Sequence, residues 1–261
     1  MNYAKKSLGQ NFLIDNNIIK KITNLIKIKD RNIIEIGPGK GALTNEILKR
    51  EPKTLTLIEK DSILAKELKL KYFLNKNIKV YNFDILKINV EKLTFKNTAV
   101  FGNLPYNISS QILVKILKFK KWPPNYNDLI FMFQKELGEK IIGEFNTKNY
   151  GRLSILTNYK LNIIKKFFVS SNCFFPKPKV TSMVIHFKPK LRKTSNIKDL
   201  ISLEKTTNIF FSNKRKMVNK SIKKILSISE IKQITDLNIT SRPAEIKPEI
   251  YYKIAEEKRK S

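Results

Sequence analysis

The stretch NIIEIGPGKG at residues 32–41 decides the fold that we expect for this chain. Its apolar first half predicts a buried strand, its glycines predict a tight turn, and the sequence ALTNEIL at residues 42–48 predicts a helix. A strand, a glycine turn and a helix open a nucleotide-binding βαβ unit, in which missing side chains let the backbone approach the ligand. The glycines are spaced G-x-G-x-G, and the sequence G-x-x-x-x-G-K-[ST] is missing, so the turn alone does not identify that ligand.

Two acidic residues follow the next predicted strands. The strand at residues 54–58 ends in Glu59, whose carboxylate can accept hydrogens from both ribose hydroxyls of a nicotinamide or an adenosyl cofactor. Asp84 lies just after the strand at residues 78–81, where it can bind an adenine amino group or cap a helix. Because ligands of open α/β sheets bind outside the carboxyl ends of the strands, we expect both acids at one binding site.

The stretch FGNLPY at residues 101–106 follows a fourth predicted strand, which must end near Pro105 because proline supplies no ladder donor. The Asn103 carboxamide and the Leu104 carbonyl each offer an acceptor oxygen, and together they can hold an exocyclic amino group by both its hydrogens. The nitrogen lone pair, normally drawn into the base ring, is then available to attack an electrophile. Tyr106 offers a flat face on which a base can stack, worth ~1–3 kcal/mol. The alternative is a turn whose Asn and Pro only shape the backbone.

Three later apolar runs complete the predicted sheet, at residues 129–133, 163–169 and 180–187. We therefore predict an α/β fold with a Rossmann-like sheet of seven mostly parallel strands. Between the last two strands, the prolines of FFPKPKV at residues 174–180 stiffen an extended loop. Such a loop can hold Phe174 as a second stacking face and can bring Lys177 and Lys179 to phosphates, or it can be a rigid connector between strands.

The sequence beyond residue 189 changes character. A polar linker is followed by a pattern that is only helical, with candidate helices at residues 197–211, 215–226, 229–237 and 248–255. One of these helices would carry a basic face, made of Lys214, Arg215, Lys216, Lys220, Lys223 and Lys224. This segment is interpreted as a nucleic-acid clamp, with a solvated cap as the alternative. We predict two domains, one at residues 1–189 that carries the predicted site and a small helical one at residues 190–261 that would bind nucleic acid.

The net charge of the chain points to a polyanionic partner. Lys and Arg number 52 against 22 Asp and Glu, which gives a formal charge of +30 at neutral pH. A charge of this size indicates nucleic acid or an acidic membrane surface. Ile, Asn and Lys are also abundant, as expected of an AT-rich genome, so codon usage accounts for part of the basicity.

Cysteine and histidine are nearly missing from the sequence. The single Cys173 excludes an internal disulfide and indicates a reducing compartment. One cysteine and one histidine, His186, argue against a transition-metal site. No run of about 18 apolar residues is found, and no apolar signal-peptide segment follows the basic start. We therefore expect no metal, no membrane span and a cytoplasmic protein.

Four motifs together make the chain resemble, nearly end to end, the small-subunit ribosomal RNA adenine N6-dimethyltransferases. They are GQNFL at residues 9–13, EIGPG at residues 35–39, NLPYNIS at residues 103–109 and F-x-P-x-P-K-V at residues 174–180. The resemblance implies that S-adenosylmethionine is the methyl donor and that six residues line its site, namely Asn11, Leu13, Gly37, Glu59, Asp84 and Asn103. It also implies that Asn103 and the Leu104 carbonyl hold the target amino group. Tyr106 and Phe174 would then cover the two faces of the base.

The same resemblance implies the substrate. It is a pair of neighbouring adenosines in the hairpin near the 3′ end of small-subunit (16S) rRNA, each methylated twice at N6. The partner is then a pre-30S particle, the role lies in small-subunit biogenesis, and we expect the enzyme to act as a monomer. The target base must leave its stack at a cost on the order of a few kcal/mol, which stacking on Tyr106 and Phe174 offsets.

Three other functions stay open at this point. An enzyme that methylates an adenosine of large-subunit (23S) rRNA, of the macrolide-resistance type, would share the donor site and the proline motif. The Leu104 form of the loop and the basic helical tail favour the small-subunit enzyme. A non-catalytic RNA-binding or transcription-factor descendant of the fold is disfavoured by the intact set of Glu59, Asp84 and Asn103. A nicotinamide oxidoreductase is disfavoured by the glycine spacing and by the lack of a catalytic His or Tyr-Lys pair.

Overall fold

The structure, a computed structural model, describes residues 10–191 and 197–260 of the chain. The chain forms two compact units, one built around a β-sheet and one helical. The sheet unit takes residues up to 116, then 124–138 and 163–189, and the helical unit takes residues 117–123, 139–162 and those from 190 onward. The last segment of the helical unit therefore begins at residue 190, and its two other segments come from inside residues 1–189.

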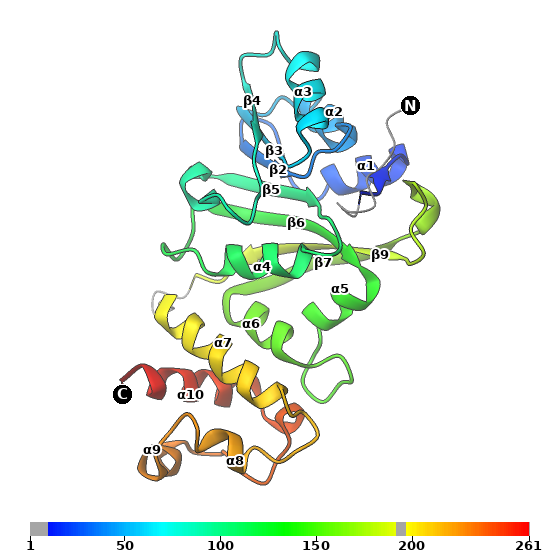
Figure 1. The fold of residues 1–261 in the computed structure, drawn as a ribbon. Coiled ribbons are helices and arrows are strands. Elements are labelled where there is room, and N and C mark those ends of the chain that lie inside the picture. The colour runs from blue at the N-terminus through cyan, green and yellow to red at the C-terminus, as the bar shows by residue number, and fades with distance from the viewer. Residues whose placement is uncertain (1–9, 192–196, 261) are drawn as a thin grey trace. The chain divides into compact units, whose positions relative to one another are not determined.

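A seven-stranded sheet organises the first unit (Figure 1). Its strands are β2 (Asn32–Ile36), β3 (Thr54–Glu59), β4 (Ile78–Asn82), β5 (Thr98–Asn103), β6 (Tyr126–Gln134), β7 (Leu161–Val169) and β9 (Ser182–Pro189). The order across the sheet is β4-β3-β2-β5-β6-β9-β7. Strands β2 to β6 pair in parallel, and β9 joins β6 antiparallel. The predicted α/β fold with a Rossmann-like, mostly parallel sheet of seven strands is confirmed.

Short helices connect these strands. They are α1 (Asn16–Thr23), α2 (Ala42–Leu48), α3 (Ser62–Lys71), α4 (Ser109–Leu117) and α5 (Lys135–Ile141), with the 3-10 turns η2 (Val90–Leu93) and η3 (Ser171–Cys173). The side chains of Asp15 and Asp61 cap α1 and α3 by accepting backbone N–H groups of the first turn. The sequence pattern did not predict α3, but the cap explains where this helix begins.

One buried core fixes the strands of the main sheet. Ile33 of β2, Leu57 of β3 and Phe101 of β5 belong to it, together with residues of α1, α2 and α3. Full burial of a side chain of this size contributes ~1.5–3 kcal/mol relative to exposure. Because the strands are fixed, their ends are held in register, and Ile36 lies opposite both Ile58 and Gly102. The glycine turn, Glu59 and the loop after β5 consequently lie side by side.

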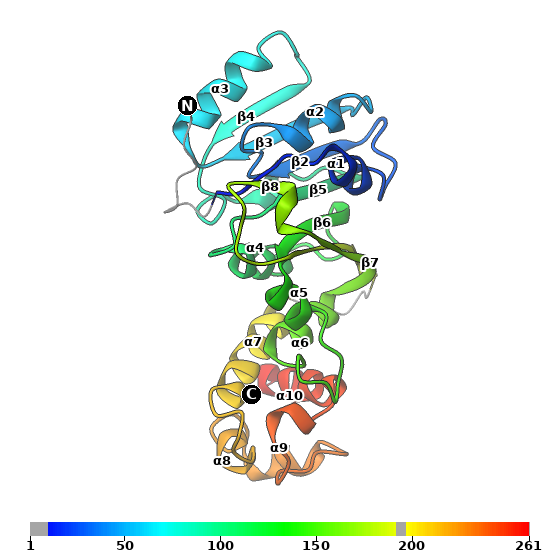
Figure 2. The ribbon, with the colours of Figure 1, turned by 90° about the vertical axis from the view of Figure 1, so that its right-hand side faces the viewer.

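A second, two-stranded sheet joins segments that lie far apart in the sequence. β1 (Phe12–Leu13) pairs antiparallel with β8 (Phe174–Phe175), and the Ile14 N–H donates to the Cys173 carbonyl at 2.8 Å. Figure 2 shows β8 beside the N-terminal segment. The sequence predicted a stiff proline loop, but not its pairing with the N-terminal segment, which we call the arm. The pairing ties the arm to the proline loop, and residues 10–13 of the arm lie at the carboxyl edge of the main sheet.

The helical unit has a core of its own. Its helices are α6 (Arg152–Lys160), α7 (Ile197–Phe211), α8 (Asn219–Ile222), α9 (Ile228–Gln233) and α10 (Pro248–Lys260), with the 3-10 turn η4 (Pro243–Glu245). Tyr251 of α10 is buried with its ring 5.6 Å from that of Phe210, and its hydroxyl donates to the Pro243 carbonyl at 2.8 Å. Tyr150 donates in the same way to the Ile246 carbonyl at 2.9 Å. These contacts anchor α10 to the segments around it.

The helix predicted at residues 215–226 is wrong over most of its length. Residues 212–216 form turns, and only α8 is helical. Three consecutive cations, Lys214, Arg215 and Lys216, repel one another, and no acidic residue lies within a helical turn of them to offset the repulsion. All three are exposed, so the expected basic helix face is a basic loop, residues 212–218.

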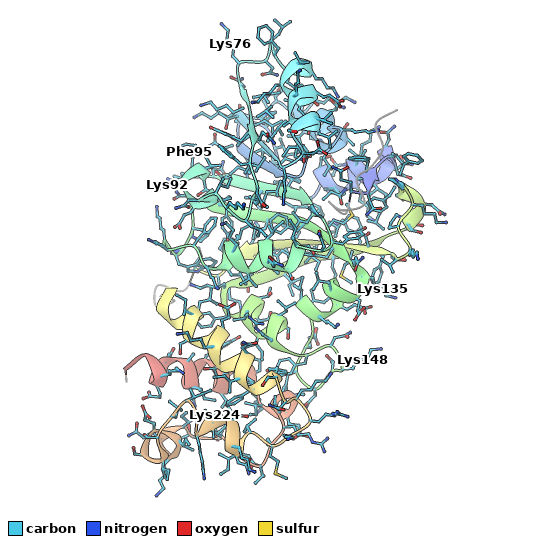
Figure 3. The ribbon with its side chains drawn as sticks, viewed as in Figure 1. Lys76, Lys92, Phe95, Lys135, Lys148 and Lys224 are labelled. Atoms are coloured by element: carbon cyan, nitrogen blue, oxygen red, sulfur yellow. The ribbon has the colours of Figure 1, made fainter. Side chains whose placement is uncertain are left out.

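Basic side chains are exposed on both units. Of the lysines labelled in Figure 3, Lys76, Lys92 and Lys135 belong to the sheet unit and Lys148 and Lys224 to the helical unit, and all five are exposed. Lysines that result from codon usage are expected on every part of the surface, and this distribution over both units agrees with that expectation. Within the described ranges, no helix has the length and apolarity needed to cross a membrane.

Candidate active site

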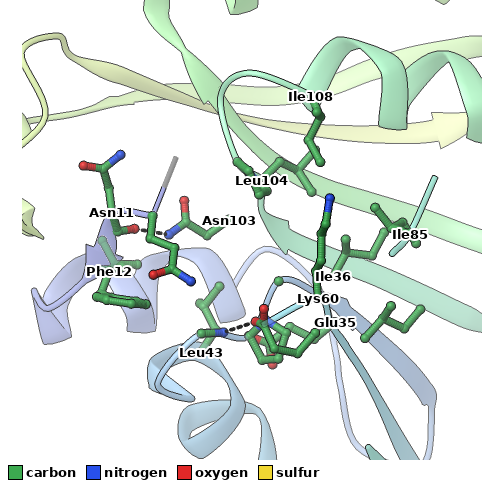
Figure 4. A pocket seen from close by; sticks show the side chains of 18 of the residues that line it. Asn11, Phe12, Glu35, Ile36, Leu43, Lys60, Ile85, Asn103, Leu104 and Ile108 are labelled. Atoms are coloured by element: carbon green, nitrogen blue, oxygen red, sulfur yellow. Dashed lines mark hydrogen bonds between the residues drawn. The ribbon is translucent and has the colours of Figure 1, made fainter. Parts of the chain in front are cut away.

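A pocket opens at the carboxyl edge of the main sheet (Figure 4). It is lined by residues 10–13, 35–40, 42–43, 58–60, 83–85 and 103–108. Eight of the nine predicted site residues are among them, namely Asn11, Leu13, Gly37, Glu59, Asp84, Asn103, Leu104 and Tyr106. The glycine turn, the two acids and the loop after β5 thus surround a single pocket. The ninth residue, Phe174, does not line it.

The glycine turn is closed by the N-terminal arm. Gly37 and Gly39 adopt φ angles of 69° and 58°, a region that favours glycine. A Cβ atom on Gly39 would lie 2.9 Å from the ring of Phe12, so a larger residue would push the arm away. The Lys40 Nζ lies 5.1 Å from the centre of the same ring. The absence of a side chain at Gly39 therefore lets the arm cover the turn.

Glu59 is fixed by two backbone groups. Its Oε2 accepts the Gly39 N–H at 3.0 Å and its Oε1 accepts the Asp61 N–H at 2.9 Å. The residue is 6% exposed, and burial raises its pKa although the two hydrogen bonds act in the opposite direction. A carboxylate oxygen has more than one lone pair, so both oxygens can still accept a ribose hydroxyl.

Glu35 is a pocket residue to which the sequence analysis gave no role. It is 1% exposed near the end of β2, and its Oε2 accepts the Thr44 hydroxyl at 2.7 Å. Burial, with a contribution from the charge of Glu59, raises the pKa of Glu35 to about 7. The signal in the sequence was an acid inside an apolar strand, because a carboxyl group is almost never fully buried without a partner or a function.

Asp84 closes a turn and caps no helix, because residues 85–87 form turns, and it lies at the pocket where the binding role would place it. Its Oδ1 accepts the Leu86 N–H at 2.9 Å, and its Oδ2 forms an ion pair with the Lys60 Nζ at 2.9 Å. The Lys60 ammonium and the Leu86 N–H together hold the pKa of Asp84 below its ordinary value. Lys60 also lines the pocket and was not predicted. An adenine amino group at this place would share the Asp84 carboxylate with Lys60.

The Asn103 carboxamide is oriented by the arm. Its Nδ2 donates to the Asn11 carbonyl at 3.0 Å, as Figure 4 shows. A carbonyl can only accept, so this bond fixes which end of the carboxamide is the nitrogen. No donor among residues 10–191 and 197–260 reaches Oδ1 of Asn103 or the carbonyl oxygen of Leu104. The two acceptors that the sequence analysis selected are therefore both available.

Tyr106 is held by its hydroxyl. The hydroxyl oxygen lies 2.6 Å from Oγ of Ser182, the first residue of β9. Burial raises the pKa of Tyr106, so the phenol stays neutral at physiological pH. The ring is half-buried and lines the pocket, which leaves part of it open to a ligand.

The structure does not bring Phe174 into the pocket, contrary to the expectation of a second stacking face. Phe174 is 2% exposed and belongs to the same buried core as Leu13, its partner in the β1–β8 pair. Successive residues of a strand point to opposite sides, so the next residue, Phe175, faces outward and is 64% exposed. The pairing with β1 thus decides which of the two rings is buried.

The residues present fit an adenosyl donor. Glu59 offers two fixed acceptor oxygens, which suit the hydroxyls of a ribose, and Asp84 offers a carboxylate, which suits an amino group. The glycine turn allows close approach of a ligand to the backbone. The acceptors at Asn103 and Leu104, which no described donor reaches, lie at the same pocket and suit a second, hydrogen-donating ligand.

Comparisons with known proteins agree with this site. The sequence model of a family described as ribosomal RNA adenine dimethylase matches residues 1–260. A protein from Pelagibacter ubique named ribosomal RNA small subunit methyltransferase A is 42% identical over 261 residues, covering 97% of this chain and 96% of that protein. One of the same name from Wolbachia pipientis subsp. Culex pipiens is 43% identical over 227 residues, covering 85% and 84%.

Solved structures share the fold. A dimethyladenosine transferase from Plasmodium falciparum has a TM-score of 0.72 at 24% identity, covering 93% of this chain and 95% of that one. The 23S rRNA methyltransferase ErmE has a TM-score of 0.69 at 25% identity, covering 95% and 99%. The chain therefore belongs to the ribosomal RNA adenine dimethylase family, whose members are enzymes that take their methyl groups from S-adenosylmethionine.

Proposed function

We propose that this protein dimethylates N6 of two adjacent adenosines in the 3′-terminal hairpin of small-subunit rRNA during assembly of that subunit. The small-subunit names of relatives that are 42% and 43% identical support the choice of RNA. The observation that carries the reaction is the orientation of Asn103, whose Nδ2 is bound to the Asn11 carbonyl while its Oδ1 accepts from no described donor.

The donor side of the pocket would bind S-adenosylmethionine, which supplies a methyl group on a positively charged sulfur. Glu59 would accept the ribose hydroxyls, and Asp84 would accept the adenine amino group. The turn at Gly37 would let the backbone approach the donor, while Asn11 and Leu13 of the arm would cover it. Because the methyl group arrives activated, the protein need only bind and align, and no covalent nucleophile is required.

The base side of the pocket would hold the target adenine. Asn103 Oδ1 and the Leu104 carbonyl would each accept one hydrogen of the amino group, which directs the nitrogen lone pair toward the methyl group. The nitrogen loses one proton for each methyl group that it gains. After the first transfer one hydrogen remains, and either acceptor can hold it, so the same pair can serve the second transfer. Tyr106 would support the extruded ring from one face.

Exposed basic residues would hold the RNA backbone. The basic loop at residues 212–218 presents Lys214, Arg215 and Lys216, and the proline loop presents Lys177 and Lys179. Binding of this kind weakens with salt because each phosphate contact releases counterions. We further propose that residues 190–261 form the RNA-binding domain, that residues 1–189 form the catalytic domain, and that the enzyme acts as a monomer on a pre-30S particle in the cytoplasm.

Mapping of modified adenosines tests this function directly. We expect primer extension on rRNA to stop at two adjacent adenosines of the small-subunit hairpin in cells with the gene and to read through in cells without it. Complementation with an Asn103→Ala variant should not restore the stops. Stops in large-subunit RNA would instead support the macrolide-resistance type of enzyme, which the likeness to ErmE keeps as the second candidate. Identical patterns with and without the gene would contradict both.

A further inference from the structure

The loop that carries the base-binding residues is fixed at both ends. At its start, Asn103 donates to the Asn11 carbonyl at 3.0 Å, and at its end the Tyr106 hydroxyl lies 2.6 Å from Ser182 Oγ. The first bond orients an acceptor for the target amino group. The second bond involves a residue that is 0% exposed and that the proposed reaction does not otherwise use.

Ser182 is itself held in place by the backbone around it. The carbonyl of the preceding Thr181 accepts the Lys135 N–H at 2.9 Å. Ser182 pairs with Gln134 in the antiparallel ladder between β6 and β9. The next side chain, Met183, fills the space beside Gly138, where even a Cβ atom would lie 2.9 Å from its sulfur. The Ser182 hydroxyl is therefore a fixed point at the end of the proline loop.

We infer that Ser182 is a positioning residue for methyl transfer, which holds in place the far end of the Tyr106 ring against which the target adenine stacks. The inference rests on the proposed function. The Tyr106 ring is half-buried, and rotation about its Cα–Cβ and Cβ–Cγ bonds lets such a ring swing and tilt within its rotamer well. The hydroxyl oxygen lies on the Cβ–Cγ axis, so a hydrogen bond to it stops the far end of the ring from swinging about the Cα–Cβ bond. Because a phenolic O–H prefers the plane of its ring, the same bond also favours one tilt of the ring. A base stacked on a tilted ring would miss Asn103 Oδ1 and the Leu104 carbonyl, and small misplacements of reacting groups lower rates steeply.

A double-mutant cycle separates positioning from simple stabilisation. Ser182→Ala and Tyr106→Phe remove the same hydrogen bond from opposite ends, and Tyr106→Phe leaves β9 untouched. We expect each to lower kcat/KM for an RNA hairpin substrate by about 10-fold with unchanged donor affinity in calorimetry. The kcat/KM of the double variant should be no lower than that of the slower single variant, because the bond can be lost only once. Ser182→Thr, which keeps a hydroxyl, should restore most of the rate.

A buried serine elsewhere supplies the matched control. Ser154 is also 0% exposed and hydrogen-bonded, to Gly151 in the helical unit, and it lies outside the pocket. Ser154→Ala should leave kcat/KM at the wild-type value, and thermal unfolding of every variant reports any loss of stability. The inference would be overturned if Ser182→Ala kept the wild-type kcat/KM, or if Ser154→Ala lost as much of it. It would also be overturned if the loss in the double variant equalled the product of the two single losses. Failure of the wild-type protein to methylate adenosine at all would overturn the proposed function and this inference with it.

Discussion

The donor side and the base side of the pocket differ in how their polar groups are satisfied. On the donor side, Glu59 accepts two backbone N–H groups, Asp84 accepts one and pairs with Lys60, and Glu35 accepts a hydroxyl. On the base side, the acceptor oxygens of Asn103 and Leu104 receive no hydrogen bond from the described residues. The protein itself therefore already engages the acids of the donor side, whereas the base side keeps two acceptors that a ligand can use.

Removal of the Asn103 acceptor should give the largest effect. We expect Asn103→Ala to lower the single-turnover rate of methyl transfer by about 10³-fold, since the carboxamide aligns the reacting nitrogen and losses of one positioned group reach this size. RNA affinity should stay near the wild-type value, because that affinity comes mainly from phosphate contacts. A radiolabelled methyl-transfer assay measures the rate, and wild-type turnover in this variant would remove Asn103 from the reaction.

Loss of a satisfied acid on the donor side should act on binding. Glu59→Ala removes both acceptors for the ribose and leaves the N–H groups of Gly39 and Asp61 without their partner. We expect the donor to bind about 10- to 100-fold more weakly in calorimetry, the size of one or two charge-assisted hydrogen bonds. The affinity for RNA should not change. An unchanged donor affinity would refute the ribose assignment and the distinction between the two sides.

The donor side should also make the stability of the protein depend on pH. The pKa of Glu35 is raised by burial from 4.5 to about 7, so its contribution is fully present below about pH 4.5 and is lost as the pH rises through about 7. Glu35→Gln removes this loss. Between pH 5 and pH 8 we therefore expect the variant to gain about 2–3 kcal/mol in free energy of unfolding relative to wild type. Urea unfolding at the two pH values measures this free energy. If it changed with pH equally in both proteins, burial would not raise the pKa of Glu35.

The smallest effect is expected outside the pocket. Arg215→Glu combined with Lys216→Glu should weaken RNA binding about 10-fold and reduce its salt slope by about 2, because two phosphate contacts are lost. Donor binding should not respond. A matched control is Lys76→Glu with Lys92→Glu, an equal change of charge at two exposed positions of the sheet unit. Equal losses in both pairs would mean that net charge, and not the basic loop, holds the RNA.

The sequence predicted those parts of the site that backbone rules determine. Glu59, Asp84 and the loop from Asn103 follow strands whose carboxyl ends must meet in a parallel sheet, so their convergence could be expected from the sequence alone. Gly37 and Gly39 were recognisable because only glycine serves a turn of that kind at a binding edge. In each case the local sequence and the geometry of a parallel sheet were sufficient to place the residue at the binding edge.

The parts that failed depend on contacts between distant segments. Phe174 and Phe175 are adjacent aromatic residues, and only the pairing of β8 with β1 decides which of them is buried. Two-residue strands have no periodicity by which they could be found. The helix expected at residues 215–226 has apolar residues at helical spacing. That spacing takes no account of the repulsion among neighbouring cations, which opposes a helix there. Glu35 could have been noticed as a buried acid, although its partner Thr44 becomes evident only in the fold.

The antiparallel pair of β1 and β8 has a consequence for synthesis on the ribosome. Residues 12 and 13 emerge early, yet their partners at 174 and 175 follow after more than half of the chain has been made. The arm can therefore take its final place only late in translation, and the carbonyl of Asn11 can orient Asn103 only then. A nascent chain that stalls before residue 174 would hold a folded glycine turn but no finished catalytic centre.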